Sequence, residues 1–147
     1  MERHLMAPKV LLVDDEEEFA HLLARRLETR GIQVVAVSSG EEAVSLVDQR
    51  VFDVAVIDLS MPGIDGIETL KQIKAKRSDI EVLMLTGHAT VAGGIEAMKQ
   101  GASDFLQKPV EIEELLKKIN KARQSHLAVV HQKADAAMQE ILKRKSW

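Results

Sequence analysis

The chain has 147 residues, of which 46% are hydrophobic, 29% charged and 3% aromatic, with a formal net charge of −3 and no cysteine. This length suits one domain with a real core, and the lack of cysteine excludes a disulfide framework, a thiolate nucleophile and a cysteine-based zinc site. The near-balanced charge gives no basic field for nucleic acid, so we expect no direct nucleic-acid binding. No apolar run approaches the roughly 18 residues of a membrane span, so we expect a soluble, cytoplasmic protein without membrane contact.

Five short apolar runs predict five β-strands. They are Val10–Val13, Gln33–Val37, Val54–Ile57, Val82–Leu85 and the weaker Ser103–Leu106. Their hydrophobicity is continuous rather than alternating, which is typical of strands covered on both faces in a parallel sheet between helical layers.

Amphipathic stretches after these strands predict five helices. Their inward residues are expected to be Phe19, Leu22, Leu23 and Leu27 before a stop at Gly31; Ala43, Val44 and Val47 after a start at Ser38 or Ser39; Ile67, Leu70 and Ile73; Val91, Ile95 and Met98; and, after Pro109, Ile112, Leu115, Leu116 and Ile119. Gly93 and Gly94 each cost the fourth helix up to about 1 kcal/mol, so its start should be loosely held. The repeated strand–helix units predict an α/β fold with a doubly wound parallel sheet, in which ligands collect at the carboxyl ends of the strands.

Polar side chains follow four of the predicted strands at this ligand-binding edge. They are Asp14, Asp15 and Glu16 after the first strand, Asp58 after the third, Thr86 after the fourth and Lys108 after the fifth. Converging carboxylates repel one another, and a divalent cation such as Mg²⁺ relieves that repulsion. Such a cation could also make Asp58 a nucleophile toward a phosphoryl group, with Lys108 and Thr86 contacting the phosphoryl oxygens. One aspartate after a strand is more often a helix cap or turn residue, so the prediction depends on the coincidence across four strand ends.

Four motifs carry a family resemblance. They are Val10-Leu11-Leu12-Val13-Asp14-Asp15-Glu16, Asp58-Leu59-Ser60-Met61-Pro62-Gly63-Ile64-Asp65-Gly66, Leu85-Thr86-Gly87-His88 and Gly101-Ala102-Ser103-Asp104-Phe105-Leu106-Gln107-Lys108-Pro109. Over about residues 8–124 the sequence resembles the receiver domain of two-component response regulators. The resemblance implies a flavodoxin-like fold of five parallel strands and five helices. It also implies that Asp58 accepts a phosphoryl group from a sensor histidine kinase or a phosphotransfer protein.

The same resemblance implies a metal site. Asp14 and Asp15 would hold Mg²⁺, or Mn²⁺ in its place, together with Asp58 and the backbone carbonyl of Ser60. Asp15 would be the more direct ligand of the pair.

The resemblance further implies a switch. Thr86 and Phe105 would be the switch pair, and Lys108 would contact the phosphoryl group and precede a cis peptide bond to Pro109. The surface of the fourth helix, fifth strand and fifth helix would change and control a partner protein. Without the neighbouring motif, Phe105 would be interpreted as an ordinary core aromatic. The Ser60 side chain and His88 lie near the expected site and are candidate modulators of phosphoryl lifetime.

Residues 125–147 are predicted to form a helical tail or linker after the receiver at 8–124, with no output domain. A heptad-like apolar stripe runs along this segment, through Leu127, Val130, Ala134, Ala137 and Ile141. It is out of phase with the preceding helix, which suggests a bend or a change of face near Gln124 and Ser125. A homodimer through this tail, or through the predicted switch surface, is expected.

Three functions are compatible with these patterns. The first is a stand-alone receiver that controls a partner and is not an enzyme beyond Mg²⁺-dependent self-phosphorylation and slow self-dephosphorylation. The second is the amino-terminal part of a longer transcriptional regulator. The third is a phosphohydrolase of the haloacid dehalogenase kind, which acts through an aspartyl phosphate. This third function is disfavoured because that group carries Asp-x-Asp after its first strand, whereas this chain has Asp14-Asp15-Glu16.

Overall fold

The computed structural model describes residues 7–61, 63–87 and 91–144, with ten elements that alternate strand and helix. The elements are β1 (Lys9–Val13), α1 (Glu17–Glu28), β2 (Gln33–Val37), α2 (Gly40–Leu46), β3 (Val54–Asp58), α3 (Gly66–Lys76), β4 (Glu81–Thr86), α4 (Val91–Lys99), β5 (Asp104–Gln107) and α5 (Ile112–Arg144). Each predicted strand is present within one residue of its predicted start.

The five strands form one sheet in the order β2-β1-β3-β4-β5, and every neighbouring pair is parallel. This order confirms the predicted α/β doubly wound fold. The chain direction across the sheet reverses between β1 and β3, so the carboxyl ends of these two strands flank the point where such sheets bind ligands.

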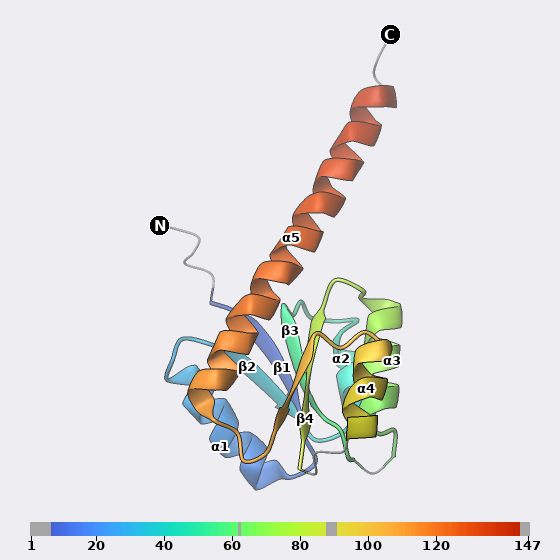
Figure 1. Ribbon diagram of the computed structural model, residues 1–147. Helices are drawn as coiled ribbons and strands as arrows, with labels where there is room; N and C mark the ends of the chain where they lie inside the picture. Colours follow the sequence, from blue (N-terminus) through green and yellow to red (C-terminus); the bar gives the residue numbers. More distant parts are fainter. Residues whose placement is uncertain (1–6, 62, 88–90, 145–147) are drawn as a thin grey trace.

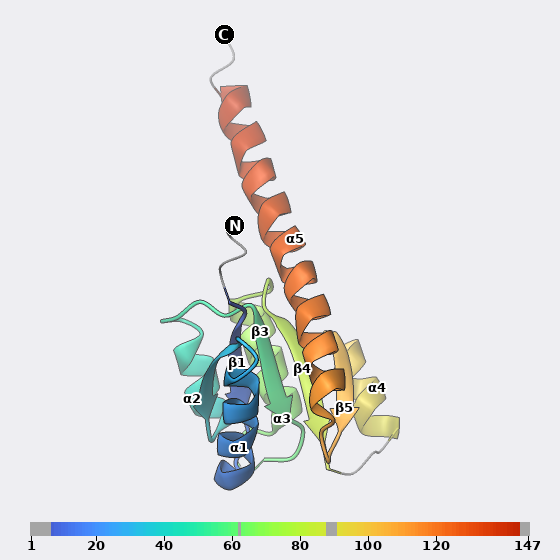
Figure 2. The same cartoon turned by 90° about the vertical axis from the view of Figure 1, so that its left-hand side faces the viewer.

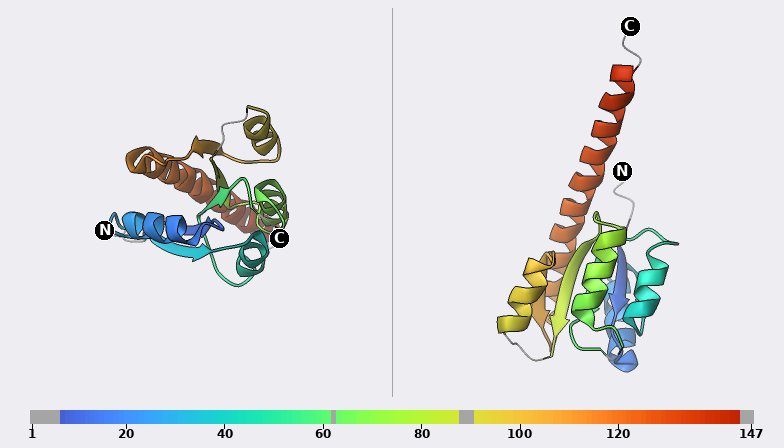
Figure 3. Two further views of the ribbon diagram at one scale, coloured as in Figure 1. Left: turned by 90° about the horizontal axis from the view of Figure 1, so that it is seen from below. Right: turned by 90° about the vertical axis from the view of Figure 1, so that its right-hand side faces the viewer.

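The sheet lies between two helical layers, with α1 and α5 on one face and α2, α3 and α4 on the other (Figures 1 and 3). Alternate side chains of β1 pack against the two helical layers. Leu11 and Val13 belong to the apolar cluster beneath α2, α3 and α4, whereas Val10 and Leu12 belong to the cluster beneath α1 and α5. Both faces of β1 and β3 are therefore buried, which explains their continuous hydrophobic sequences.

Side chains at two helix starts fix where α2 and α3 begin. The Ser39 hydroxyl accepts a hydrogen bond from the Glu42 amide, which confirms one of the two predicted starts. Asp65 caps α3 in the same way, through the Glu68 amide. A β-carbon at Gly66 would collide with the backbone of Asp58, so only glycine lets α3 begin directly against the end of β3.

Three residues predicted to face inward instead face solvent. Leu22 is 59% exposed, Ile95 50% and Met98 45%. Among the residues of α4 whose side chains the structure describes, the buried ones are small, Gly94 and Ala97. The larger side chains of α4 are therefore left on the surface.

Helix α5 is one uninterrupted helix of 33 residues, about 50 Å long at the usual rise per residue. Its first half packs on the sheet through Leu115, Ile119, Ala122 and His126, and the rest projects beyond the amino ends of the strands (Figures 1 and 2). The helix does not break at Gln124 and Ser125. Instead, the buried face ends at His126, and apolar side chains beyond it are exposed.

None of the helices in the described part of the chain combines the length and the apolar character needed to cross a membrane.

Candidate functional site

Three carboxylates and one lysine meet at the carboxyl edge of the sheet. Asp14 follows β1, Asp58 ends β3 and Lys108 follows β5. Asp14 and Asp58 are buried, and each lies with Glu16 in a group whose carboxylate oxygens are within 4.8 Å of one another. The convergence predicted from strand-end positions is therefore present.

Lys108 is held mainly by the acidic residues that follow β1. Its Nζ lies 2.7 Å from Glu16 Oε1, 2.9 Å from Asp14 Oδ2 and 3.8 Å from Asp58 Oδ2. It also sits 4.2 Å from the centre of the Phe19 ring, within cation–π distance. Burial acts to lower the pKa of Lys108, but the hydrogen bonds with Glu16 and Asp14 and the surrounding negative charges raise it above the usual value. Lys108 is thus a fixed positive charge beside Asp58.

The pKa of Asp58 is raised from 3.8 to about 6. Burial is the largest cause, and the negative charges of Asp14 and, to a smaller extent, Asp15 act in the same direction. Lys108 and the Ser60 amide, which donates to Asp58 Oδ1 over 3.3 Å, oppose the shift. Asp58 therefore carries an unfavourable charge at neutral pH that a cation or a phosphoryl group could relieve.

The donor set of this edge fits a small divalent cation. Asp14 Oδ1 accepts a hydrogen bond from the Glu16 amide over 2.9 Å. Asp14 Oδ2 is buried and lies 2.9 Å from the Lys108 ammonium. Grouped carboxylate oxygens suit Mg²⁺, which completes its shell with water or phosphate oxygens. Asp15, a predicted ligand, is exposed and lies outside the three-carboxylate group.

The predicted switch residues occupy the last two strands. Thr86 is buried at the end of β4, where its carbonyl accepts a hydrogen bond from the Lys108 amide over 2.7 Å. Phe105 on β5 is 43% exposed, so the interpretation as a core aromatic is wrong. A β-carbon at Gly94 would lie 3.3 Å from Phe105 Cζ, which shows that the ring rests against the bare backbone of α4. The Lys108–Pro109 peptide bond is cis, as the resemblance implies.

Sequence reasoning gave no site role to two residues that contact Lys108. The sequence groups Glu16 with Asp14 and Asp15 only by position, and its hydrogen bond and ion pair with Lys108 lower its pKa. The sequence predicts Phe19 only as an inward residue of the first helix. Both contacts depend on Lys108, which is about 90 residues away in the sequence, so no local pattern indicates them. Ser60 is exposed at the edge of the site, and His88 lies outside the described residues.

With this geometry established, comparison with known proteins assigns the family. Residues 10–120 match the response regulator receiver domain, and the chain belongs to that family. It is 39% identical over 113 residues to the transcriptional regulatory protein ZraR of Escherichia coli O157:H7, covering 77% of this chain and 26% of that protein. It is 36% identical over 107 residues to the transcriptional regulatory protein TctD of Salmonella typhimurium, covering 73% of this chain and 48% of that protein.

The solved receiver domain of the Francisella response regulator 1452 has the same fold. It superposes with a TM-score of 0.74 at 34% identity, covering 80% of this chain and 97% of that one. The chain is therefore a receiver of two-component signalling, a family of signalling domains rather than classical enzymes. It spans about a quarter to a half of the curated relatives named above.

Proposed function

We propose that Asp58 accepts a phosphoryl group from the phosphohistidine of a sensor histidine kinase or a phosphotransfer protein. The observation that carries this proposal is the buried Asp58 carboxylate, flanked by Asp14 and facing the Lys108 ammonium. An Asp58 oxygen would attack phosphorus while the phosphorus–nitrogen bond breaks and the histidine nitrogen leaves with the bonding electrons. The Ser60 amide orients the carboxylate, and Lys108 would offset the charge gathering on the phosphoryl oxygens.

We assign the metal role to Asp14, Asp15 and Asp58, with the Ser60 carbonyl. Mg²⁺, when bound, would neutralise the phosphoryl oxygens and the carboxylates that repel one another here. Asp15 is close enough for its charge to raise the pKa of Asp58, which supports a role beside it. Glu16 would hold Lys108 until the phosphoryl group arrives.

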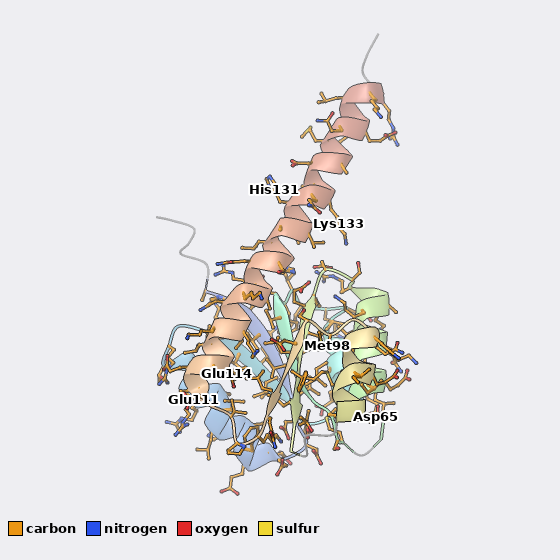
Figure 4. All side chains as sticks on the ribbon, viewed as in Figure 1. Asp65, Met98, Glu111, Glu114, His131 and Lys133 are labelled. Carbon is orange, nitrogen blue, oxygen red and sulfur yellow. The ribbon has the colours of Figure 1, made fainter. Side chains whose placement is uncertain are left out.

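Phosphorylation would then change the surface at α4 and β5. A phosphoryl group adds about two negative charges, which would draw Lys108 away from Glu16 and the Thr86 hydroxyl toward Asp58. Phe105 lies at the margin of an exposed apolar surface, which we call the α4–β5 patch and define by Gly94, Ile95, Met98, Lys99 and Phe105. Met98 protrudes from α4 (Figure 4). An exposed apolar patch of this kind suits a protein partner, and we propose that phosphorylation controls its availability.

A phosphoryl mimic tests this switch. With Mg²⁺ and beryllium fluoride, we expect the NMR signals of the Phe105 ring and of the α4 amides to move, while the amides of the outer half of α5 change less. Asp58→Asn should abolish these shifts because it removes the carboxylate that binds the mimic. Shifts of equal size in Asp58→Asn would contradict the proposed coupling.

A second proposal concerns the larger protein. The named relatives are transcriptional regulators, and this chain matches only part of their length. We propose that the receiver itself makes no DNA contact and is connected to a transcriptional output by α5, whose outer half projects from the receiver (Figure 1).

A further inference from the structure

His126 is a buried titratable residue on the side of the molecule opposite Asp58. It lies on α5 and is 4% exposed, at the end of that helix's buried face. Its partners, Asp53 and Asp79, precede β3 and β4 at the amino edge of the sheet. Neither the phosphoryl site nor the α4–β5 patch includes these residues.

Both ring nitrogens of His126 face oxygen acceptors. Nδ1 lies 2.7 Å from the Asp79 carbonyl oxygen, and Nε2 lies 3.2 Å from Asp53 Oδ1. A carbonyl oxygen can only accept, so Nδ1 must carry a hydrogen. The other carboxylate oxygen of Asp53 accepts a hydrogen bond from the Lys9 amide over 2.8 Å. With hydrogen on both ring nitrogens, His126 would be a cation that pairs with Asp53 as well as donating to the Asp79 carbonyl.

The surrounding charges stabilise this arrangement. Asp79 Oδ2 lies 3.7 Å from His126 Nδ1 and also pairs with the Arg77 guanidinium, which donates from Nε over 3.1 Å and from Nη2 over 3.0 Å. Burial acts to raise the pKa of Asp79, but the Arg77 hydrogen bonds and the charges of Arg77 and His126 hold it below the usual value. Two carboxylates therefore face one guanidinium and one imidazole ring, and a protonated ring would complete the pairing that buried charges require.

Asp53 connects this group to three strands. Its amide donates to the Lys9 carbonyl over 2.9 Å, and its carbonyl accepts from the Glu81 amide over 3.2 Å. It therefore joins the first residues of β1 and β4 at the start of β3. A side chain that binds Asp53 is therefore fastened to the starts of three neighbouring strands.

We propose that His126 is a positioning residue, a charged clasp that fastens α5 to the amino edge of the sheet and sets the direction in which residues 127–144 project. A second contact supports the same direction, because Lys133 Nζ donates to Ser78 Oγ in the Asp79 loop over 3.3 Å. Lys133 lies on the side of α5 opposite His131 (Figure 4). The clasp holds the outer half of the helix in place whether or not Asp58 is phosphorylated.

Paired spin labels test the direction of the helix. Because the chain has no cysteine, labels can be placed at Lys71→Cys on α3 and Gln139→Cys on α5, both exposed positions. Labelled chains are diluted into excess unlabelled chain so that only distances within one chain are measured. We expect one narrow distance distribution in the parent and loss of that narrow distribution in His126→Ala. His131→Ala is the matched control, since His131 is on the same helix and its side chain is 80% exposed. An equally narrow distribution in His126→Ala would overturn the proposal.

A second measurement avoids substitution altogether. Nitrogen–hydrogen correlation spectra of the unmodified chain at pH 6.5 should show a hydrogen bonded to each ring nitrogen of His126, both protected from exchange with solvent. A ring that carries a single hydrogen would overturn the charged clasp even if His126→Ala failed to fold.

Discussion

Asp58 is the residue at which burial and neighbouring charge conflict most directly. Its pKa of about 6 in the folded chain is above the ordinary value of 3.8. The folded chain therefore binds more protons than the unfolded chain between these two values, and stability falls as the pH rises through that window. Above pH 6 the full cost of the ionised carboxylate is present. Below pH 3.8 it is absent.

The first prediction is that Asp58→Asn stabilises the metal-free chain. At pH 7.5 in the presence of a chelator, we expect the free energy of unfolding to rise by about 2 kcal/mol, because the amide removes the buried charge. The difference should shrink toward zero near pH 4. Urea unfolding followed by circular dichroism measures both values, with the exposed Asp135→Asn as the control. Equal stability of Asp58→Asn and the parent at pH 7.5 would contradict the assigned charge strain.

The second prediction concerns Glu16, which holds Lys108 in the unphosphorylated chain. Glu16→Gln removes that charge partner, so Lys108 can move to Asp58 at lower cost. We expect phosphoryl uptake from a small phosphodonor to be about two- to fivefold faster, the effect of one exposed ion pair. Glu17→Gln, on the neighbouring exposed glutamate, should leave the rate unchanged. Slower uptake in Glu16→Gln would instead indicate that Glu16 is a metal ligand.

At the scale of elements, the strands could be predicted because burial on both faces leaves a signal within each strand's own sequence. Residues buried on both faces need continuous apolar sequence, and a parallel sheet brings the residues after each strand to one edge. Asp14, Asp58 and Lys108 could therefore be placed together without any long-range information. Thr86, which ends β4, could be placed at this edge for the same reason.

The inward face of α4 could not be predicted from its apolar residues. The pattern of large side chains indicates Ile95 and Met98, but α4 buries Gly94 and Ala97. The reason lies on another element, because the Phe105 ring packs so close that a β-carbon at Gly94 would lie only 3.3 Å from it. The glycine that was expected only to weaken the helix is also the residue that gives this ring its place.

His126 could not be predicted for a similar reason. In the sequence, His126 is one of many polar residues of α5. The Asp79 carbonyl that it contacts is 47 residues away in the chain. Long-range polar pairs leave no local periodicity, so only the folded chain shows them.

The third prediction concerns the outer half of α5 as a dimer element. Its exposed apolar side chains are Leu127, Val130, Met138, Ile141 and Leu142. A second copy packed along the Leu127–Ile141 stripe would cover several of them. We expect sedimentation equilibrium to show dimerisation that depends on concentration. Ile141→Glu should raise the dimer dissociation constant about tenfold or more, because a charge would be buried in the interface. Gln132→Glu lies off the stripe and should not weaken it. A parent chain that stays monomeric at high concentration would exclude this interface.

At the scale of the whole molecule, the two ends of the sheet have separate roles. The phosphoryl site lies at the carboxyl ends of the strands, while α5 projects from the amino ends (Figures 1 and 2). The outer half of α5 is fastened at the amino edge through His126. Phosphorylation should therefore change a surface near Asp58 while the projecting helix keeps its direction.

The most direct test of the receiver assignment is the intact mass of the chain after incubation with acetyl phosphate and Mg²⁺. We expect the mass of one phosphoryl group to be added to the parent chain, and none to Asp58→Asn or to the parent with the metal chelated. Borohydride reduction followed by peptide mapping should place the modification at Asp58. An adduct of equal yield in Asp58→Asn, or no adduct in the parent, would contradict the proposal that Asp58 is the phosphoryl acceptor.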